Sequence, residues 1–261
     1  MKKKALVVLS GGQDSTTCLF WAKQNYLEVH AVTFDYGQRH RIEIDAAITV
    51  AKMAKIADHE IIDVRNCLIS TSPLTSNAKL EQYENFEQMD KVIGNRVELT
   101  FVPMRNMLFL TIAMNRAVAL GQGTDVITGI CQADNANYPD CTESFRSAFE
   151  RAADRALQAA TDAYNPFCRT VAPFIFKSKA EMVKIARTLP GCWHALAYSH
   201  TSYDGKYPPV DMNHSNVLRA QGFEEAGLPD PLVLRAVYEG RMDYPDTPNY
   251  DDDLILRNPF R

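Results

Sequence analysis

Six consecutive residues near the start of the chain, Ser10–Ser15, combine hydroxyl groups, an amide, a carboxylate and two glycines in the sequence Ser-Gly-Gly-Gln-Asp-Ser. Gly11 and Gly12 permit backbone angles that other residues resist, and they leave their N–H groups accessible. The apolar run Leu6–Leu9 before them is typical of a buried strand, and Asp14–Thr16 are typical of a helix start. A strand, a glycine turn and a helix N-terminus direct several N–H groups and the helix dipole at one point. The sequence therefore predicts an anion site here.

The overall composition is that of a soluble globular protein. The 261 residues are enough for one domain with an appendage. The contents of hydrophobic residues (46%) and charged residues (23%) are ordinary for a soluble globular protein. A net charge of −4 disfavours a large nucleic-acid surface. No apolar run approaches the roughly 20 residues that span a membrane, and the short run after the N-terminal lysines predicts no signal peptide. The six cysteines form no C-x-x-C pair, which favours reduced thiols in the cytoplasm.

The hydrophobic pattern predicts alternating strands and helices, which indicates an α/β protein with a parallel sheet. Strands are expected over 6–9, 29–34, 59–64, 125–130 and 170–174. Helices are expected over 14–22, 40–57, 101–120 and 142–163, with another beginning near Lys177. Residues 65–98 are polar and lack a pattern, so we expect a mobile cover over the site.

Several motifs resemble the 7-cyano-7-deazaguanine synthase (QueC) family of the PP-loop ATP pyrophosphatases. They are Ser10–Ser15, which lacks the lysine of a Walker loop, and 34–40, 102–106, 138–141 and 218–220. The resemblance covers roughly residues 5–222. It implies a parallel-sheet adenine-nucleotide alpha-hydrolase (HUP, Rossmann-like) sandwich with helices on both faces and a smaller C-terminal helical and loop extension. We expect an ATP-binding domain over 1–190, with 65–98 as an insertion or lid, and a C-terminal segment over 191–261.

The resemblance also implies roles for individual residues. Asp14, Lys179 and Arg105 are the expected catalytic residues, and Asp14 is expected to hold Mg²⁺ through the pyrophosphate. A cation in the first turn of a helix opposes the helix dipole, which supports an anion beside Lys179 and Arg105. The expected ATP-binding residues are Ser10, Gly11, Gly12, Gln13, Asp14, Ser15, Phe34, Arg105 and Gly129.

The deazaguanine substrate is expected to contact Tyr36, Gln38, Arg39, Asp134, Tyr138, Asp140 and Arg219. A carboxylate such as Asp140 can accept two hydrogen bonds from the N–H edge of a guanine-like base, and the Tyr138 ring can stack on that base. Arg219 has two open interpretations. It could pair with a substrate carboxylate or phosphate, or it could brace the C-terminal segment.

The chain departs from the family where the family carries four zinc-binding cysteines. Ser202, Val210, Asn213 and Asn216 stand at those positions, and none of these residue types supplies a thiolate. We therefore expect no zinc, and we expect hydrogen bonds and packing from Tyr203, Tyr207, Pro208 and Pro209 to order the segment. A rebuilt site from Cys192, His194, His200 and His214 is conceivable, but the spacing does not favour it.

The expected reaction is attack of the carboxylate of 7-carboxy-7-deazaguanine on the α-phosphate of ATP, followed by ammonia, first to an amide and then to the nitrile. The altered residues leave a second interpretation open, in which the activated acid is transferred to another amine such as a protein N-terminus. A non-catalytic ATP-binding sensor is an alternative of a different class. The resemblance also implies a homodimer.

Overall fold

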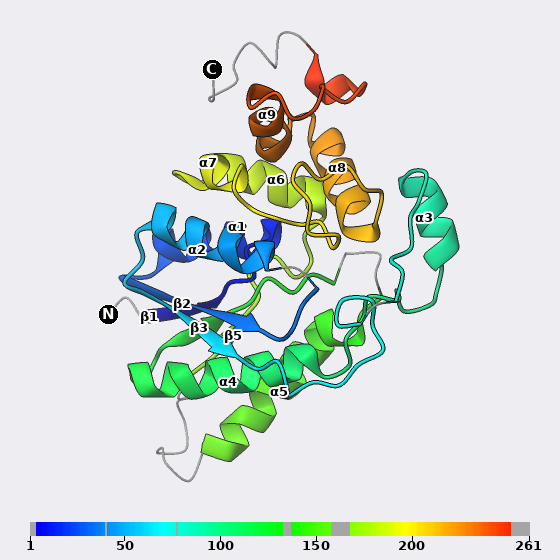
Figure 1. The fold of residues 1–261 in the computed structure, drawn as a ribbon. Helices are drawn as coiled ribbons and strands as arrows, with labels where there is room; N and C mark the ends of the chain where they lie inside the picture. Colours follow the sequence, from blue (N-terminus) through cyan, green and yellow to red (C-terminus); the bar gives the residue numbers. More distant parts are fainter. Residues whose placement is uncertain (1–3, 40, 77, 133–136, 158–167, 252–261) are drawn as a thin grey trace.

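A five-stranded parallel sheet in the order β3-β2-β1-β4-β5 forms the centre of the computed structural model (Figure 1). The structure describes residues 4–39, 41–76, 78–132, 137–157 and 168–251. The strands are β1 (Lys4–Val8), β2 (Glu28–Asp35), β3 (Asp58–Asp63), β4 (Asp125–Ile127) and β5 (Thr170–Val171). In the register, Val7 of β1 pairs with Ala31 of β2 and Ile127 of β4. The expected parallel sheet is confirmed, although its last two strands are shorter than predicted.

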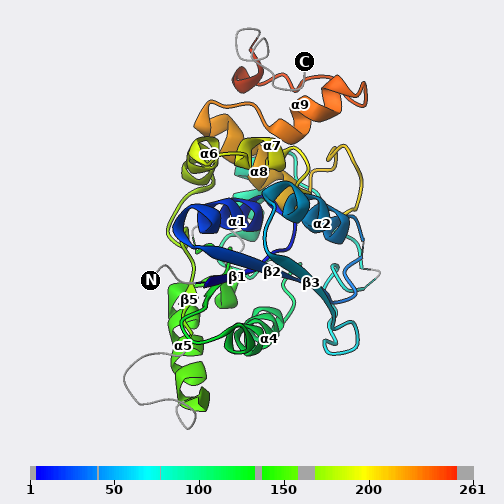
Figure 2. The same ribbon diagram turned by 90° about the vertical axis from the view of Figure 1, so that its left-hand side faces the viewer.

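Helices cover both faces of the sheet, as predicted. On one face lie α1 (Gln13–Asn25) and α2 (Ile42–Ala54), and on the other lie α4 (Arg105–Leu120) and α5 (Glu143–Leu157) (Figures 1 and 2). The C-terminal helices stack beyond α1 and α2, and they are α6 (Lys179–Thr188), α7 (Cys192–Leu196), α8 (His214–Ala226) and α9 (Pro231–Tyr238). Two short 3-10 turns, η1 (Pro139–Cys141) and η3 (Pro248–Tyr250), complete the regular structure of the described residues. None of the described helices is long and apolar enough to cross a membrane.

Each face of the sheet has its own hydrophobic core. The core under α4 joins Leu6, Val32 and Phe34 to Leu110 and Met114. The core on the α1 side joins β1 and α1 to residues late in the chain, including Trp193, Leu196 and Phe223. The C-terminal helices therefore complete the core that the N-terminal strand and helix begin.

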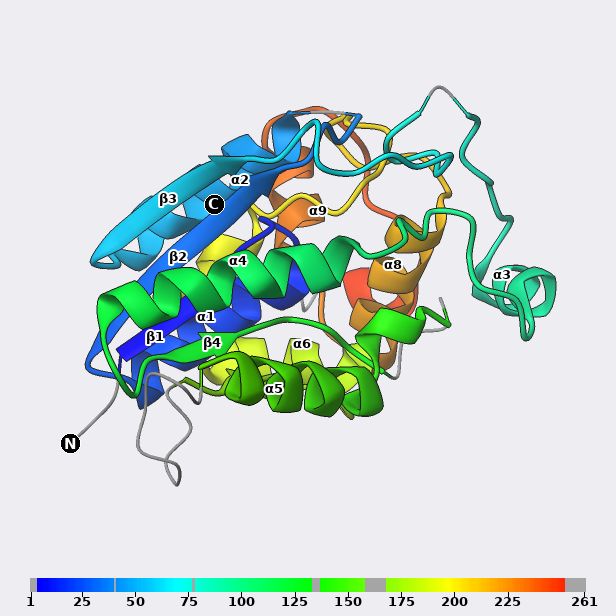
Figure 3. The same ribbon diagram turned by 90° about the horizontal axis from the view of Figure 1, so that it is seen from below.

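The segment over 65–98 differs from its expectation. It contains a helix, α3 (Phe86–Ile93), whose N-cap is Asn85. The Asn85 side chain accepts a hydrogen bond from the Gln88 N–H. Met89 and Ile93 of α3 are buried against Tyr83 and Val217 of α8, and the segment lies beside α8 (Figure 3). The sequence pattern missed α3 because only two turns carry its apolar face.

The strand order places one crevice where a ligand would bind. The chain moves outward from β1 through β2 to β3, and then crosses to the opposite side of β1 for β4 and β5. In open parallel sheets, ligands bind beyond the carboxyl ends of the strands at such a switch point, here between β1 and β4. Ser10–Ser15 follows β1, and Gly129 follows β4.

Candidate active site

A cavity of about 270 Å³ opens at the carboxyl ends of β1, β2 and β4. One part of its wall is the loop after β1 together with Lys179, and another is the start of α4 with Arg105 and Asn106. The C-terminal segment supplies further wall residues, including Tyr203 and His214. None of the described residues of 65–98 lines the cavity, so the predicted cover does not form its wall.

Two glycines allow the loop to fit into the fold. Gly11 has a φ of +86°, and a Cβ atom there would lie 2.4 Å from the Glu43 carbonyl oxygen. A Cβ on Gly129 would lie 3.1 Å from the Ser15 nitrogen. The neighbouring elements therefore press on the loop, and only glycine fits at Gly11 without displacing backbone. Gly129 lines the cavity and Gly11 does not, so Gly11 shapes the loop from behind.

The loop is organised by its own hydroxyl groups and has donors left over. The Ser10 and Ser15 hydroxyls lie 3.0 Å apart, and Ser15 Oγ donates to the Gly12 carbonyl at 3.2 Å. Gly12 is the N-cap of α1 and supplies no capping side chain. The Gln13 side chain is buried, lines the cavity, and its Nε2 donor has no partner among the described residues. An unpaired buried donor at a helix N-terminus fits an anion such as the pyrophosphate of ATP.

Asp14 and Lys179 form an ion pair in the cavity wall. The Lys179 ammonium lies 2.5 Å from Asp14 Oδ2, and the two side chains are 11% and 23% exposed. Lys179 is the first residue of α6, whose N-cap Ser178 forms a capping box with Glu181. The cation predicted to need an anion therefore has a carboxylate partner, and both groups face the space where phosphates would bind. A carboxylate is a ligand type that Mg²⁺ accepts, so Asp14 fits the expected metal contact.

Arg105 lines the cavity from the start of α4. Its guanidinium carbon is 5.6 Å from the centre of the Tyr36 ring, and burial raises the pKa of the Tyr36 phenol to about 12. Met104, the N-cap of α4, has a φ of 64° and a ψ of 4°, in the left-handed region. Methionine here adopts a backbone conformation that costs a residue with a side chain about 1–2 kcal/mol.

Most of the predicted site residues lie in the cavity wall. They are Ser10, Gly12, Gln13, Asp14, Ser15, Phe34, Tyr36, Gln38, Arg105, Gly129, Tyr138, Lys179 and Arg219. Asp134 lies outside the described residues. The roles of these residues toward ATP and substrate remain predictions.

Two predicted substrate contacts are placed elsewhere. Arg39 is exposed, does not line the cavity, and donates to the Ala78 carbonyl at 3.3 Å. Asp140 is buried behind Asn106, whose backbone N–H donates to it at 3.4 Å, and it does not line the cavity either. Burial raises the pKa of Asp140, and the charge of Arg105 opposes that shift. Asp140 therefore lies behind the cavity wall, in contact with Asn106, and its predicted contact with the base stays untested.

Arg219 is held by the protein itself. Its Nε and Nη2 donate to the two carboxylate oxygens of Asp230 at 2.5 and 2.8 Å, and the arginine is 3% exposed. Nη1 donates to the hydroxyls of Ser199 and Thr201 at 2.9 and 2.8 Å. The three guanidinium nitrogens are thus committed, although the side chain reaches the cavity wall. This geometry favours the bracing interpretation, and the substrate contact of Arg219 stays an untested prediction.

Glu43 and His214 are among the titratable residues of the cavity wall that the motif analysis did not assign to the site. Glu43, in the first turn of α2, and His214, the first residue of α8, both line the cavity. Glu43 falls only three residues after the motif 34–40, which was the one available signal. No pattern marks a buried histidine as part of a cavity.

Glu43 predicts a pH-dependent stability. Burial raises the pKa of its carboxyl from 4.5 to about 7, and Arg105 only partly opposes this. The folded state therefore binds the proton more tightly, and the free energy of unfolding contributed by Glu43 falls as the pH rises from about 4.5 to about 7. At 1.36 kcal/mol per pKa unit, we expect Glu43→Gln to be more stable than the wild type by about 3 kcal/mol at pH 8, with little difference at pH 4.

Urea unfolding of both proteins at the two pH values measures this difference. Asp45→Asn is the matched control because Asp45 is an exposed acid in the same helix. A gain in stability of the Glu43→Gln protein that is the same at both pH values would contradict the raised pKa.

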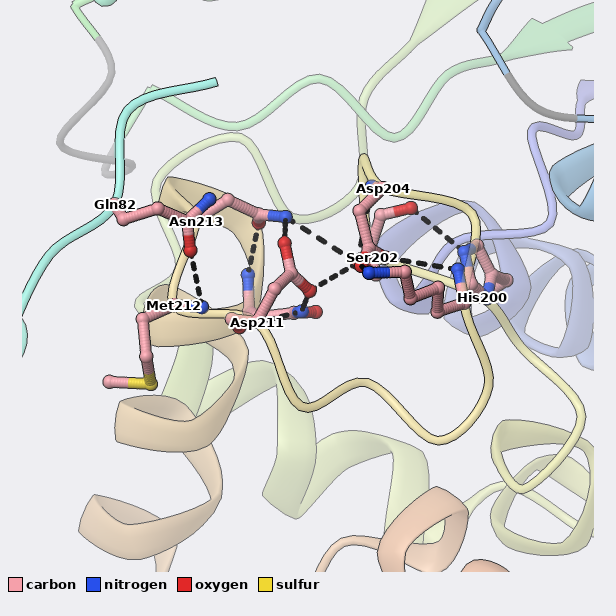
Figure 4. A network of polar contacts seen from close by, with 9 residues as sticks. Gln82, His200, Ser202, Asp204, Asp211, Met212 and Asn213 are labelled. Carbon is pink, nitrogen blue, oxygen red and sulfur yellow. Dashed lines mark hydrogen bonds and ion pairs between the residues drawn. The ribbon is translucent and has the colours of Figure 1, made fainter. Parts of the chain in front are cut away.

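A hydrogen-bonded network occupies the segment where the family binds zinc (Figure 4). Ser202 Oγ lies 2.7 Å from Asp204 Oδ1 and 2.6 Å from Asp211 Oδ1, and the side-chain amides of Asn213 and Asn216 donate to Asp211. The backbone N–H of Met212 donates to Gln82 Oε1 at 2.9 Å, which links the network to the segment before α3. Three of the four positions that carry cysteine in the family thus take part in the network. Hydrogen bonds do link this segment, but they come from Ser202, Asp211 and the two asparagines and not from the tyrosines and prolines that the sequence analysis named.

This network predicts that chelation leaves the fold intact. Asp211 already accepts hydrogen bonds from Ser202, Asn213 and Asn216, and no described group of three or more His, Cys, Asp or Glu residues is arranged to hold a metal. We expect less than 0.1 equivalent of zinc by elemental analysis of the purified protein, and no change in melting temperature after EDTA. Stoichiometric zinc, or a large fall in melting temperature on chelation, would contradict the prediction.

A model of the family described as "Queuosine biosynthesis protein QueC" matches residues 4–227 of the chain. The chain belongs to the QueC family. The match confirms the resemblance stated from the motifs, and α9 lies beyond its end.

Curated QueC relatives are similar over nearly their whole length. The 7-cyano-7-deazaguanine synthase of Laribacter hongkongensis is 45% identical over 235 residues, which cover 88% of this chain and 94% of that protein. The synthase of Gloeobacter violaceus is 45% identical over 232 residues, covering 88% and 95%. The synthase of Chromobacterium violaceum is 42% identical over 241 residues, covering 92% and 97%.

Proposed function

We propose that this protein is an ATP-dependent carbon–nitrogen ligase that converts 7-carboxy-7-deazaguanine to 7-cyano-7-deazaguanine and releases AMP and pyrophosphate. One observation carries the proposal: the Ser10–Ser15 loop with Lys179 and the Arg105 end of α4 face one cavity. The names of the QueC relatives supply the product.

The loop end of the cavity activates the acid. The substrate carboxylate attacks the α-phosphate of ATP, and the bond to pyrophosphate breaks. The leaving pyrophosphate binds to the N–H groups at the start of α1, the Gln13 amide and the Lys179 ammonium. These donors stabilise the charge of the leaving group. Asp14 would hold Mg²⁺, which supplies charge neutralisation for the phosphates when it is bound.

The remaining steps require positioning more than covalent catalysis. Ammonia attacks the activated carbonyl, AMP leaves, and an amide forms, and a second round of activation removes the amide oxygen to give the nitrile. Arg105, with Tyr36 and Tyr138 beside it, is suited to hold the anionic acid in place, since a buried cation over an aromatic ring orients a carboxylate. No residue of this cavity needs to form a bond to the substrate.

A second acceptor remains a candidate because of two exposed apolar residues. Met104, at the start of α4, and Val210, where the family has a zinc-binding cysteine, are each 61% exposed. Apolar side chains at these places favour an acceptor larger than ammonia, such as a protein N-terminus.

Mass spectrometry of the products distinguishes the candidates. The protein is incubated with 7-carboxy-7-deazaguanine, ATP and Mg²⁺, with ammonia in one arm and with amine-bearing peptides in another. The nitrile in the ammonia arm supports the synthase. A reaction that stops at the amide, or that gives a product only with a peptide, would contradict the synthase function. Turnover with release of pyrophosphate would exclude a non-catalytic sensor.

A further inference from the structure

The cavity wall contains a histidine that the reaction described above does not use. His214 is 4% exposed, and it is the first residue of α8, after the N-cap Asn213. Its Nε2 is buried without a hydrogen-bond partner among the described residues. Leaving a buried ring nitrogen unpaired is costly, and a bound molecule with an N–H group would remove that cost.

The surroundings place His214 near the phosphate end of the cavity. Lys179 and Glu98 are the charged groups that act on it. Helix α8 approaches α6 so closely that a Cβ on Gly222 would lie 2.5 Å from the Lys179 Cβ, and Lys179 in turn contacts Asp14 of the loop. The close approach at Gly222 is in the second half of α8, and His214 at the start of the helix lines the same cavity as Lys179 and Asp14.

The environment also keeps the imidazole neutral. Burial lowers the pKa of His214, Lys179 lowers it further, and Glu98 opposes the shift. A neutral ring nitrogen is a proton acceptor. The other histidine of the wall, His200, differs because its Nε2 already lies 2.8 Å from the Ser202 carbonyl oxygen, on the edge of the network in Figure 4.

We propose that His214 is the base that accepts the proton of the attacking amine in the second half of the reaction. This rests on the proposed function. The amine lone pair forms the C–N bond to the activated carbonyl carbon, and the C–O bond to the phosphate of AMP breaks, with the electron pair leaving on AMP. The proton lost by the nitrogen goes to Nε2 of His214 and from there to solvent.

Two measurements on the full-length protein separate this role from a structural one. Acid-dependent exchange of pyrophosphate into ATP reports activation, and amide formation from ammonia reports the amine step. We expect His214→Gln to keep exchange within about twofold of wild type and to lose about 10²-fold or more in amide formation, the usual size of a general-base contribution. In His214→Ala, added imidazole should restore part of the amide formation without changing exchange.

Two other histidines provide controls. His194→Gln changes an exposed histidine, and we expect neither rate to change. His200→Gln removes a structural contact, and we expect both rates to fall together. Amide formation by His214→Gln within threefold of wild type, or a joint fall of both of its rates without rescue by imidazole, would overturn the proposal. An absence of acid-dependent exchange in the wild type would overturn the proposed function, and this inference with it.

Discussion

Lys179→Ala is expected to lower the rate of acid-dependent pyrophosphate exchange by about 10²–10³-fold, the effect of removing one preorganised charge from a water-poor site. The Lys179 ammonium is 11% exposed and lies 2.5 Å from Asp14 Oδ2. Pyrophosphate gains negative charge as it leaves, and the Lys179 ammonium, at the start of α6, contacts Asp14 of the loop. Its loss should therefore act on the transition state for activation.

Lys177→Ala is the matched control for this measurement. Lys177 lies two residues earlier, is 45% exposed, and pairs with Glu181 at 2.7 Å on the surface of α6. We expect its exchange rate to stay within twofold of wild type, and both variants to melt within a few degrees of wild type, because the Asp14 side chain is 23% exposed and can be hydrated. Equal exchange rates for Lys179→Ala and Lys177→Ala would remove Lys179 from the catalytic residues.

Arg219→Ala is expected to lower the free energy of unfolding by about 3–5 kcal/mol, the usual cost of removing one partner of a buried ion pair. Arg219 and Asp230 are 3% and 5% exposed at their side chains, and the variant would leave the Asp230 carboxylate buried without its cation. The double variant Arg219→Met with Asp230→Asn should recover most of the loss. Asn can still accept the Leu232 N–H bond that caps α9.

Arg241→Ala provides the comparison for an exposed pair, because Arg241 is 54% exposed and contacts Glu239 at 2.9 Å. We expect it to cost less than about 1 kcal/mol. Urea unfolding measures all three variants. Wild-type stability of Arg219→Ala, combined with a tenfold rise in KM for the acid, would support the substrate contact and contradict the bracing role.

The parts of the fold that the sequence predicted well are those with a strong local cause. The apolar run before Ser10 has no polar alternation, and only a strand buried on both faces suits it. The start of α6 was predicted near Lys177, and the structure shows a capping box formed there by Ser178 and Glu181. Helix α3 was missed because its two buried positions, Met89 and Ile93, depend on a distant partner, Val217 of α8.

In the candidate site, too, the features with a local cause were predicted and those that depend on distant partners were not. Residues of the loop reach the cavity because the backbone of one short segment positions them. Arg39, Asp140 and Arg219 lie on segments with the right motif, but their direction is decided by tertiary partners, which are Ala78, Asn106 and Asp230. The sequence shows the charges of these residues but not their partners. It likewise does not show that Glu43 and His214 lie in the cavity wall.

The core on the α1 side is shared by the N-terminal and C-terminal parts of the chain, which limits where this enzyme can be truncated or recombined. Leu19 and Phe20 of α1 belong to the same buried cluster as Trp193, Leu196 and Phe223, so the first helix stays uncovered until residue 223 has been synthesised. A protein truncated at residue 190 should consequently bind the dye ANS and be digested rapidly by protease, unlike the full chain. The nucleotide-binding half is therefore not a module that could be exchanged between relatives by recombination at residue 190. Such a chimera would need matching residues on both sides of this core.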